Sequence, residues 1–515
     1  MSALVCRAAS VSLTGLEGEI VTVEAAVSQQ LPGMAIIGLP DAALAEAKQR
    51  VRTATAQAGL QLADRFITVN LSPASLPKHG SGFDLAIALA ALAASRKLPA
   101  SRLDGIAHLG ELSLSGGLRR PAGLLSAVIA ARRHGFSRVM VPGDSADEAA
   151  LVPGIEVIAV EGIAHAVAWY RGERRALDLR RAVVLPGPGS RREEVRDLSE
   201  VVGQPESVEA LVVAAAGKHH VSMVGPPGAG KTLLATGLPS ILPELDDDEA
   251  LEASSIASLG GDPLTALVRR PPFESPHHTA SSASIVGGGT GNEVRPGAIT
   301  RACHGVLFID EAPEFNRSVL DALRQPLETG RVEIHRARVR ATMPAKVQLV
   351  LAANPCPCGN AGAPETEAKC RCTPHLRYSY MQRISGPLAD RIDLRLSLAR
   401  VSRVLRDDQR GGRQDSRALR ARVERARRVA AKRLRGTPWR VNSEVPGSWL
   451  RSSDARLART ETQVLDRALE RGSITLRGYD RVLRMAWSIA DLSDEVKPGR
   501  KEIASALAYR GGGLS

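Results

Sequence analysis

The stretch GPPGAGKT at residues 225–232 has two glycines separated by four residues and followed by Lys and Thr, the pattern of a phosphate-binding loop. HHVSMV at 219–224 predicts a buried strand before the loop, and LLATGL after it begins a helix. Backbone N–H groups of such a loop surround an anion at a helix N-terminus. A Gly/Pro-rich turn without a ligand is the alternative, and the Lys-Thr pair argues against it. We expect nucleotide contacts from Gly225, Pro226, Pro227, Gly228, Ala229, Gly230, Lys231 and Thr232.

A second apolar stretch, GVLFIDE at residues 305–311, ends in two acids. Its four apolar residues predict a buried parallel strand, and α/β sheets bind ligands at the carboxyl ends of such strands. We expect Asp310 and the Thr232 hydroxyl to hold Mg²⁺, and Glu311 to orient or activate the attacking water. Together with the phosphate loop, this strand predicts an enzyme that hydrolyses a nucleoside triphosphate.

Composition restricts the class of protein. A chain of 515 residues exceeds a single core, so two to four domains are expected. The formal net charge of +13 favours a polyanionic partner, and the aromatic content of 3% disfavours binding of single strands by stacked rings. The N-terminal residues have no signal-peptide pattern, and the apolar run at 85–94 is too short to span a bilayer. These features predict a cytoplasmic enzyme without a membrane segment.

The alternation of strand-like and helix-like patterns divides the chain. We expect strands at 67–73 and 138–142 and helices at 42–58 and 82–95 in the N-terminal part. The polar, Pro/Gly-rich stretch that follows reads as a linker. The predicted divisions are an N-terminal domain at 1–172, a linker at 173–199, a nucleotide domain at 200–398 and a helical lid at 399–515, with a loop around 437–448.

Five long segments carry a resemblance to a known family: SPHHTASSASIVGGG at 275–289, RPGAITRACHGVLFIDEAPEF at 295–315, NPCPCG at 354–359, SGPLADRIDL at 385–394 and LRGYDRVLRMAWSIADL at 476–492. They resemble the magnesium-chelatase-like AAA+ ATPases of bacteria, in particular the ComM (YifB) group. The resemblance implies an α/β fold class with a central AAA+ P-loop αβα domain and an all-helical C-terminal lid. It also implies ATP as the nucleotide, a homohexameric ring, and a DNA helicase that drives branch migration during recombination of incoming DNA.

The resemblance also assigns roles to single residues. Asn354, which ends the apolar strand predicted at 347–353, is similar to the sensor-1 residue that holds the attacking water or the γ-phosphate. Arg391 resembles the arginine finger that reaches the neighbouring subunit's γ-phosphate. The alternatives are a strand-end cap for Asn354 and a surface ion pair of Arg391 with Asp390 or Asp393.

Arg477 begins the LRGYDRVLR segment and resembles the sensor-2 arginine of the lid. Arg481 and Arg484 follow at i+4 and i+7 and therefore share its helical face. The choice among the three stays open.

Residues 330–346 alternate in polarity and predict a β-hairpin, where this AAA+ clade carries a hairpin that points into the ring. Such a basic hairpin suits sliding contact with DNA phosphates. A solvated hairpin without a ligand is the alternative. The predicted DNA contacts are His335, Arg336, Arg338 and Arg340, and the segment 284–296 resembles the clade's other insertion loop.

Four of the six cysteines form a C-x-C-x₁₁-C-x-C pattern: Cys356, Cys358, Cys370 and Cys372. Four thiols in two close pairs can make a tetrahedral site for structural Zn²⁺. Free or redox-labile thiols are the alternative, because the spacing within each pair is tighter than usual. Cys6 and Cys303 are predicted to be lone and inert.

The positive charge is concentrated at residues 401–440, which hold fourteen Lys/Arg and four Asp/Glu, so that +10 of the net charge of +13 lies there. Part of this region, residues 418–434, predicts an amphipathic helix with an apolar stripe and arginines on its other faces. A solvated lid helix and a DNA-facing surface are both compatible with this pattern.

The N-terminal region resembles the proteolytic domain of Lon-type proteases, a ribosomal S5-like α+β fold. The segments are LPKHGSGFDLAIALAAL at 76–92 and LGELSLSGGLRRPAGLLSAVIAA at 109–131. In that register Gly82 stands at the position of the nucleophilic Ser and Leu125 at the position of the catalytic Lys. Neither side chain can form the dyad, and Ser81 or Lys78 would have to substitute. We therefore predict a non-catalytic scaffold rather than a protease.

Three functions from different classes remain. A motor on DNA is favoured by the basic hairpin, the basic lid and the long family segments. The first alternative is a magnesium-chelatase motor subunit, which would need separate porphyrin-binding partners. The second is an ATP-dependent protein remodeller whose N-terminal domain binds peptides.

Overall fold

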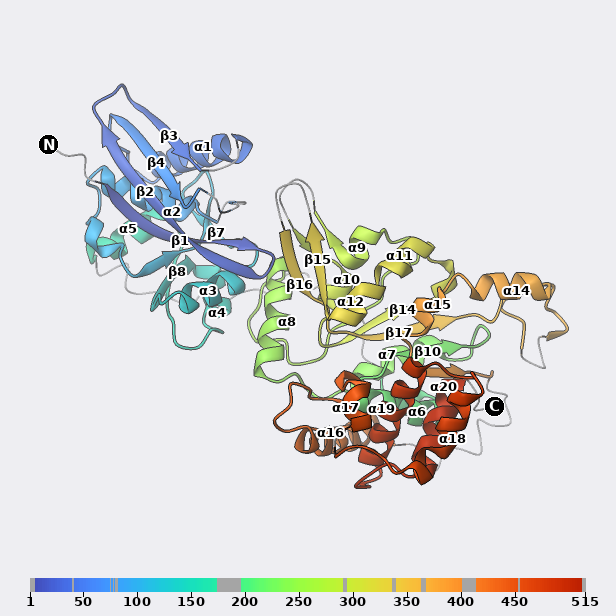
Figure 1. The fold of residues 1–515 in the computed structure, drawn as a ribbon. Coiled ribbons are helices and arrows are strands. Elements are labelled where there is room, and N and C mark those ends of the chain that lie inside the picture. The colour runs from blue at the N-terminus through green and yellow to red at the C-terminus, as the bar shows by residue number, and fades with distance from the viewer. Residues whose placement is uncertain are drawn as a thin grey trace.

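The structure, a computed structural model, describes residues 5–38, 41–74, 76, 78, 82–173, 196–289, 294–335, 340–362, 367–400, 414–452 and 454–511. An N-terminal domain, a nucleotide domain and a helical lid follow one another in the chain (Figure 1). The lid lies against the nucleotide domain, and the N-terminal domain lies beside the hairpin of that domain.

The N-terminal domain is built on a mixed sheet in which the described strands have the order β3-β4-β2-β1-β5-β8-β9. Helix α2 is buried along its whole length, which fits its almost uniformly apolar sequence. The predicted strands and helices of this region are confirmed within two residues. The elements are β1 Cys6–Thr14, β2 Glu17–Ser28, β3 Gly33–Ile37, α1 Asp41–Gln57, β4 Phe66–Ser72, α2 Asp84–Ala94, β5 Ile106–His108, β6 Glu111–Leu112, β7 Leu118–Arg119, α3 Leu124–Arg133, β8 Arg138–Pro142, α4 Ala146–Ala149, β9 Glu156–Val160 and α5 Ile163–Arg171.

The nucleotide domain contains a parallel sheet of order β11-β14-β17-β10-β18. The strands predicted at 219–224, 305–311 and 347–353 form β10, β14 and β17, and their carboxyl ends meet at one edge. The elements are α6 Pro205–Gly217, β10 Val221–Val224, α7 Lys231–Ile241, α8 Asp247–Gly260, β11 Phe273–Glu274, α9 Ser282–Val286, β12 Gly287–Gly288, β13 Arg295–Pro296, α10 Ala298–Arg301, β14 Val306–Ile309, α11 Arg317–Ala322, α12 Arg324–Thr329, β15 Arg331–His335, β16 Arg340–Pro344, β17 Gln348–Ala353, α14 Pro374–Met381, α15 Gly386–Ala389 and β18 Leu394–Ser397.

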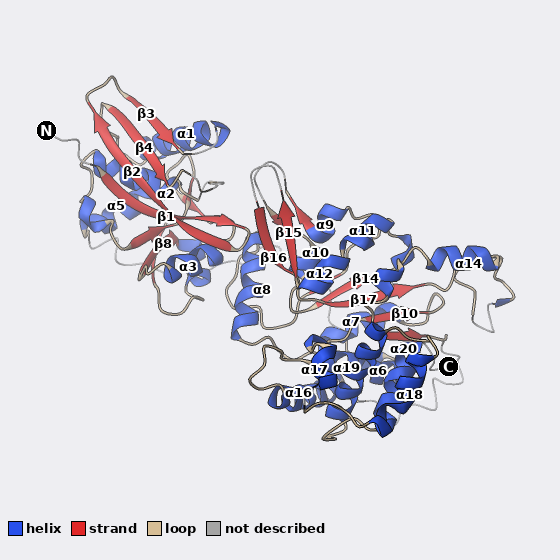
Figure 2. Cartoon of the chain, viewed as in Figure 1, coloured by secondary structure: helices blue, strands red, loops and turns tan. Residues whose placement is uncertain are grey.

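The regular elements in the described part of the lid are all helices, as predicted, and loops connect them (Figure 2). A buried polar network joins it to the sheet. The Asp393 carboxylate accepts from Arg481 (2.5 Å) and from the backbone N–H of His220 (2.9 Å). His219 Nε2 lies 2.8 Å from Ser488 Oγ. The helices are α16 Ser416–Arg433, α17 Gly447–Ser452, α18 Arg459–Glu470, α19 Leu476–Leu492 and α20 Arg500–Gly511.

The packed core of the nucleotide domain begins before residue 200. Leu198, which falls in the predicted linker, is 2% exposed, and its N–H donates to Ser416 Oγ at 2.8 Å. Residues 174–195 of that linker lie outside the described residues.

Two contacts between described residues join the N-terminal domain to the nucleotide domain. Helix α3 packs along α8. The turn between β1 and β2 packs on the hairpin of β15 and β16, where a Cβ at Gly15 would lie 3.3 Å from Met343 Cε. Leu16 of the same turn joins the apolar cluster that contains Met343. Figures 1 and 2, which are drawn from the same side, show the hairpin next to the N-terminal domain.

None of the helices in the described parts of the chain is both long enough and apolar enough to cross a membrane.

Candidate functional site

The phosphate loop connects the end of β10 to the start of α7. Gly228 and Gly230 have φ angles of +80° and +81°, a region that glycine enters without steric cost. A Cβ at Gly225 would lie 2.7 Å from the carbonyl oxygen of Leu398, closer than packed atoms allow. Backbone conformation or close packing therefore favours glycine at these three positions. The loop ends at the N-terminus of a helix.

Lys231 is nearly buried and lies across the loop. Its Nζ donates to the carbonyl oxygens of Gly225 (2.6 Å) and Pro226 (3.1 Å) and to Asn354 Oδ1 (3.0 Å). Asn354 follows β17, which pairs with β10, so the strand order brings the two side chains together. Burial lowers the pKa of Lys231. The ammonium group contacts neutral oxygens, which phosphate oxygens of a nucleotide could replace.

The acids after β14 lie beside the start of α7. Thr232 Oγ1 donates to Asp310 Oδ2 at 3.1 Å, and the N–H of Glu311 donates to Asp310 Oδ1 at 2.9 Å. A hydroxyl and a carboxylate at this distance are hard oxygen ligands of the kind that Mg²⁺ takes beside phosphates. Glu311 has a φ of +50°, uncommon for a residue with a Cβ, and its side chain is half exposed.

Three polar residues at this edge were missed by the sequence analysis. Gln204 Nε2 donates to the carbonyl oxygen of Ala229 at 2.6 Å, and Arg400 Nε donates to that of Pro227 at 2.9 Å. His278 Nδ1 lies 3.7 Å from Glu311 Oε2. No spacing rule marks the first two residues. His278 lies in one of the segments that carry the family resemblance, which was the available signal.

The predicted arginine finger is held within its own subunit. Arg391 pairs with Glu328 of α12 and donates to the carbonyl oxygen of Pro387 at 2.7 Å. The alternative prediction was an ion pair of Arg391 with Asp390 or Asp393. An ion pair is present, but its partner is Glu328, and Asp393 is buried and binds Arg481. The structure therefore does not bring Arg391 into the cluster around Lys231.

The three sensor-2 candidates differ in their surroundings. Arg477 is exposed. Arg481 pairs with buried Asp393, and Arg484 Nε donates to the carbonyl oxygen of Val445 at 2.6 Å. Burial lowers the pKa of Arg484. Of the three, the first candidate is thus the one whose side chain points to solvent.

The hairpin predicted at 330–346 is formed by antiparallel β15 and β16. Its strands alternate, with one face buried and the other exposed. The exposed positions on the described strands include Arg331, His335 and Arg340. Arg336 and Arg338 lie outside the described residues. The base of the hairpin continues directly into β17, whose carboxyl end leads to Asn354.

The basic helix of the lid, α16, forms with its predicted apolar stripe buried, and it differs from the sequence expectation in where several arginines point. Four of its arginines turn back onto the protein instead of pointing to solvent or a ligand. Arg420 and Arg427 donate to the carbonyl oxygens of Ser240 and Ala215, each at 2.7 Å. The other two form ion pairs, Arg422 with Glu209 and Arg433 with Asp491. Sequence could place the arginines off the apolar stripe, but the α6 and α7 carbonyls that receive them come from tertiary packing.

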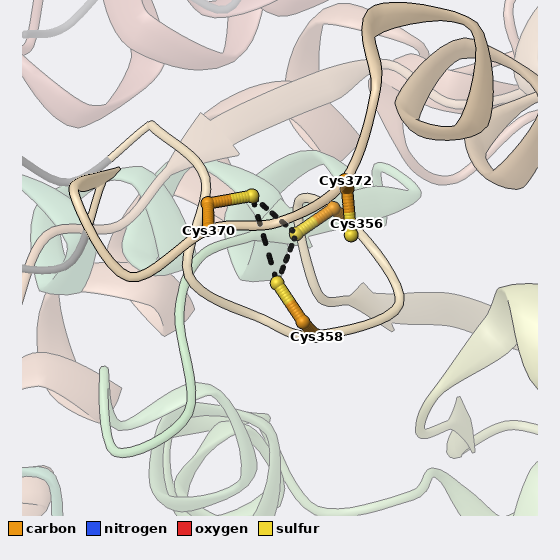
Figure 3. A group of neighbouring side chains, drawn as sticks. All are labelled: Cys356, Cys358, Cys370 and Cys372. Carbon is orange, nitrogen blue, oxygen red and sulfur yellow. Dashed lines mark hydrogen bonds between the residues drawn. The ribbon is translucent and has the colours of Figure 1, made fainter.

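The four cysteines of the C-x-C-x₁₁-C-x-C pattern come together after β17 (Figure 3): Cys356, Cys358, Cys370 and Cys372. Their sulfurs all lie within 4.8 Å of one another, with three separations of 3.4, 3.5 and 3.8 Å. Tetrahedral zinc with Zn–S bonds of about 2.3 Å separates its sulfurs by about 3.8 Å, so the cluster fits this ion. The N–H of Asn360 lowers the pKa of Cys358 to about 6, which favours one thiolate.

The loop that holds these cysteines touches the phosphate loop. A Cβ at Gly359, which has a φ of +74°, would lie 2.7 Å from ring atoms of Pro227. Glycine is therefore required at this contact, and the cysteine loop packs directly on the predicted nucleotide site.

Cys303 is not isolated, contrary to the prediction. It lies with Glu252 and His304, the second group of potential metal ligands among the described residues. His304 Nε2 is 2.5 Å from Glu252, and Nδ1 is 3.3 Å from Glu249. Although burial opposes it, hydrogen bonding to Cys303 and these carboxylates raises the pKa of His304 to about 11. His304 and these carboxylates therefore form an ion cluster in this structure.

The two dyad positions of the N-terminal domain carry no reactive group. Gly82 lies just before α2, and Leu125 is fully buried in α3, with its N–H donating to Ser258 Oγ at 3.1 Å. Lys78 is 2% exposed and donates to the carbonyl oxygens of Pro73 and Leu76. Ser81 lies outside the described residues.

Comparisons with protein families cover most of the chain. The model described as "Magnesium chelatase, subunit ChlI" matches residues 197–405. The model "Subunit ChlI of Mg-chelatase" matches residues 23–145, and "Magnesium chelatase, subunit ChlI C-terminal" matches residues 413–510.

Several relatives match nearly the full length of the chain, and another matches only part of it. An uncharacterized protein of Mycobacterium tuberculosis is 45% identical over 98% of both chains. The competence protein ComM of Haemophilus influenzae is 36% identical over 96% of this chain and 95% of its own. Lon protease 2 of Bacillus subtilis is 29% identical over only 31% of this chain and 30% of its own. The chain therefore belongs to the magnesium-chelatase-like ComM (YifB) family of AAA+ ATPases.

Proposed function

We propose that this chain is an ATP-hydrolysing ring motor that acts on DNA as a helicase and promotes branch migration during homologous recombination or transformation. The carrying observation is the continuity of the hairpin with the nucleotide site. Residue 344 ends β16, and β17 then leads to Asn354, whose side chain contacts Lys231. A displacement of β17 on nucleotide binding would move the hairpin. The name of the relative from Haemophilus influenzae, a competence protein, supports the choice of DNA.

The chemistry follows from the residues around the phosphate loop. The loop N–H groups and Lys231 would hold the phosphates of ATP, and Thr232 with Asp310 would hold the Mg²⁺ that neutralises the developing charge. Glu311 would orient the attacking water and accept its proton. Asn354, whose side chain contacts Lys231, would complete the contacts to the γ-phosphate.

Two arginines, Arg391 and Arg477, would act at the nucleotide sites of the assembled ring. Arg391 would leave Glu328 and reach the γ-phosphate of the neighbouring subunit, where a guanidinium stabilises the transferred charge. Arg477, exposed on α19, would act as sensor 2. Mixing Arg391→Ala subunits with Lys231→Ala subunits should restore part of the ATPase, because some mixed interfaces then pair an intact loop with an intact finger. A lack of activity at every ratio, in rings that exchange subunits, would reject a finger in trans.

The proposed DNA contact is the exposed face of the hairpin together with residues 336–339 that connect its two strands in the sequence. His335 and Arg340 stand on its exposed face, and Arg336 and Arg338 lie between them in the sequence, outside the described residues. Because such contacts go to phosphates, binding should be nearly independent of sequence and should weaken steeply with salt.

The test replaces the hairpin arginines Arg336, Arg338 and Arg340 by Ala. The salt slope of DNA binding should fall by about one unit for each phosphate that the protein no longer neutralises. Migration of a four-way junction should be abolished, while ATPase without DNA should stay within a few-fold, since the hydrolytic residues are untouched. The matched control removes the same charge from exposed positions of the N-terminal domain, Arg65, Arg119 and Arg132.

Other outcomes favour the alternatives. Normal junction migration by the hairpin variant would move the DNA contact elsewhere. A wild-type protein that hydrolyses ATP but binds no DNA at low salt would support the protein remodeller. Stimulation by a porphyrin-binding partner would support the chelatase subunit, the activity for which the matched family models are named.

We also propose that the four-cysteine cluster binds structural zinc. Metal analysis should give about one zinc per chain, the content of a single Cys₄ site. Cys356→Ser should remove it, whereas Cys6→Ser, at a buried cysteine outside the cluster, should not. Protein that is purified without chelators and contains no zinc would reject the proposal.

A further inference from the structure

The segment between β11 and α9 passes the acids of the nucleotide site. β11 pairs in parallel with β14, with Glu274 opposite Leu307, so the chain after β11 leaves the sheet at the edge where Asp310 and Glu311 stand. Arg301 fixes this exit by binding the Glu274 carboxylate at 2.7 Å. The segment is therefore held in place at its start.

Two adjacent histidines in this segment have different surroundings. His277 binds locally, because its Nδ1 lies 2.9 Å from Thr279 Oγ1 and accepts the N–H of Thr279 at 3.3 Å. Its ring stacks on that of His278, with 4.1 Å between the ring centroids. His278 lies near the nucleotide site instead, with its Nδ1 3.7 Å from Glu311 Oε2.

The separation of His278 and Glu311 exceeds a hydrogen bond and is short enough to become one by a small side-chain rotation. Catalytic hydrogen bonds are often long in the ligand-free enzyme and tighten in the complex. Glu311 has a positive φ and a half-exposed side chain, so little else fixes the direction of its carboxylate.

We propose that His278 is a positioning residue for Glu311. The Nδ1–H of His278 donates to Glu311 Oε2 and thereby directs the other carboxylate oxygen of Glu311 at the attacking water. The inference rests on the proposed ATP hydrolysis and adds a residue to it. A carboxylate fixed by one hydrogen bond loses less orientational freedom in the transition state, so the contribution falls on kcat and not on nucleotide binding.

The chain after His278 is anchored to the nucleotide domain. Helix α9 begins four residues later, with Ser281 as its N-cap, and leads into β12 and β13, the segment that resembles an insertion loop. Ile285 of α9 is fully buried in the core of the nucleotide domain.

Two substitutions separate the ring of His278 from its nitrogen. His278→Phe keeps the stacking on His277 and removes the donor, whereas His278→Asn loses the ring and can place an amide N–H where Nδ1 stands. We expect the Phe variant to lower kcat about tenfold at unchanged nucleotide affinity, and the Asn variant to keep most of the rate. The control is His134→Phe, because His134 pairs with Glu19 at 3.5 Å with similar exposure.

The second measurement is a double-mutant cycle with Glu311→Gln in single-turnover hydrolysis. If His278 acts through Glu311, His278→Phe should lower the residual rate of Glu311→Gln by less than twofold. An equal loss in both backgrounds, or an active Phe variant with an inactive Asn variant, would overturn the inference. A wild-type protein that binds ATP and does not hydrolyse it would overturn the proposed function and this inference together, whereas an active wild type with an unaffected Phe variant overturns the inference alone.

Discussion

The edge of the nucleotide-domain sheet and the face of α3 in the N-terminal domain both resemble enzyme active sites in sequence, and they differ in what their side chains do. At the sheet edge, Lys231, Asp310 and Asn354 converge from three separate elements. On α3, Leu125 lies in the core, and its backbone binds Ser258 of α8. The first region keeps the groups that chemistry needs, and the second uses its backbone for packing.

Arg120 shows that the second region is an interface between the N-terminal domain and α8. Its guanidinium binds buried Glu148 and also donates to the carbonyl oxygens of Ser258 (3.2 Å) and Asp262 (2.9 Å) at the end of α8. A cation at a helix C-terminus is favoured by the helix dipole. A fold can therefore persist after its reactive residues are gone, provided that the same surface acquires packing partners.

The largest expected effect tests the chemical side of this comparison. Glu311→Gln should bind ATP and lower hydrolysis by about 10³-fold or more, because the amide cannot accept a proton from water. Lys231→Ala should abolish ATP binding itself, since its ammonium supplies the charge that faces the phosphates. Nucleotide binding and phosphate release are measured for both variants. Wild-type turnover in Glu311→Gln would remove Glu311 from the reaction.

The next effect tests the interface. Arg120→Ala should destabilise the N-terminal domain by about 3 kcal/mol, because the Glu148 carboxylate, 2% exposed, loses its cation. The double variant Arg120→Met/Glu148→Leu should recover much of the loss. Urea unfolding is followed against Arg119→Ala, a neighbouring exposed arginine. A loss no larger than that of the control would show that the pair is not needed for docking.

A smaller effect, which depends on pH, tests the contact of His304 with Glu249 and Glu252 of α8. His304→Asn should cost about 2 kcal/mol, the value of a hydrogen bond to a charged group, and Asn tolerates the φ of +62°. The folded-state pKa of His304 is raised to about 11 and that of Glu249 is lowered to about 2. The stabilisation is therefore fully present between about pH 4.5 and 6.5, the unfolded values.

Above that window it should decline as the pH rises towards 11, and below it as the pH falls towards 2. The difference in unfolding free energy between wild type and His304→Asn is measured across pH 5 to 10, in a range where the fold survives. A difference that grows towards pH 10 would contradict the ion cluster.

The sequence predicted those features that depend on local patterns. The glycines at Gly228 and Gly230, the strands that carry Asp310 and Asn354, and the alternating hairpin follow from spacing and periodicity. The spacing of the cysteines was sufficient to predict that their thiols gather. In each case the interacting groups lie close in the chain or at the ends of adjacent parallel strands.

Partners that come from tertiary packing could not be predicted. Arg391, expected as an arginine finger with a pair to Asp390 or Asp393 as the alternative, binds Glu328 in this structure. Arg427 enters the protein to reach a helix carbonyl. His278 meets Glu311 because β11 lies beside β14, an adjacency that no single segment encodes. Side chains of this length can reach several elements, so the sheet order decides among them.

The smallest expected effect completes the comparison, because the dyad region should have no chemistry to lose. Ser81→Ala should change neither ATPase nor DNA binding, and the purified protein should not cleave casein with ATP. Gly82 offers no nucleophile, and Leu125 is buried where a general base would have to stand. Lys78 is occupied by two backbone carbonyls, and burial lowers its pKa. Casein cleavage that requires ATP and disappears in Ser81→Ala would show that the domain kept a reactive site, and the comparison with the sheet edge would fail.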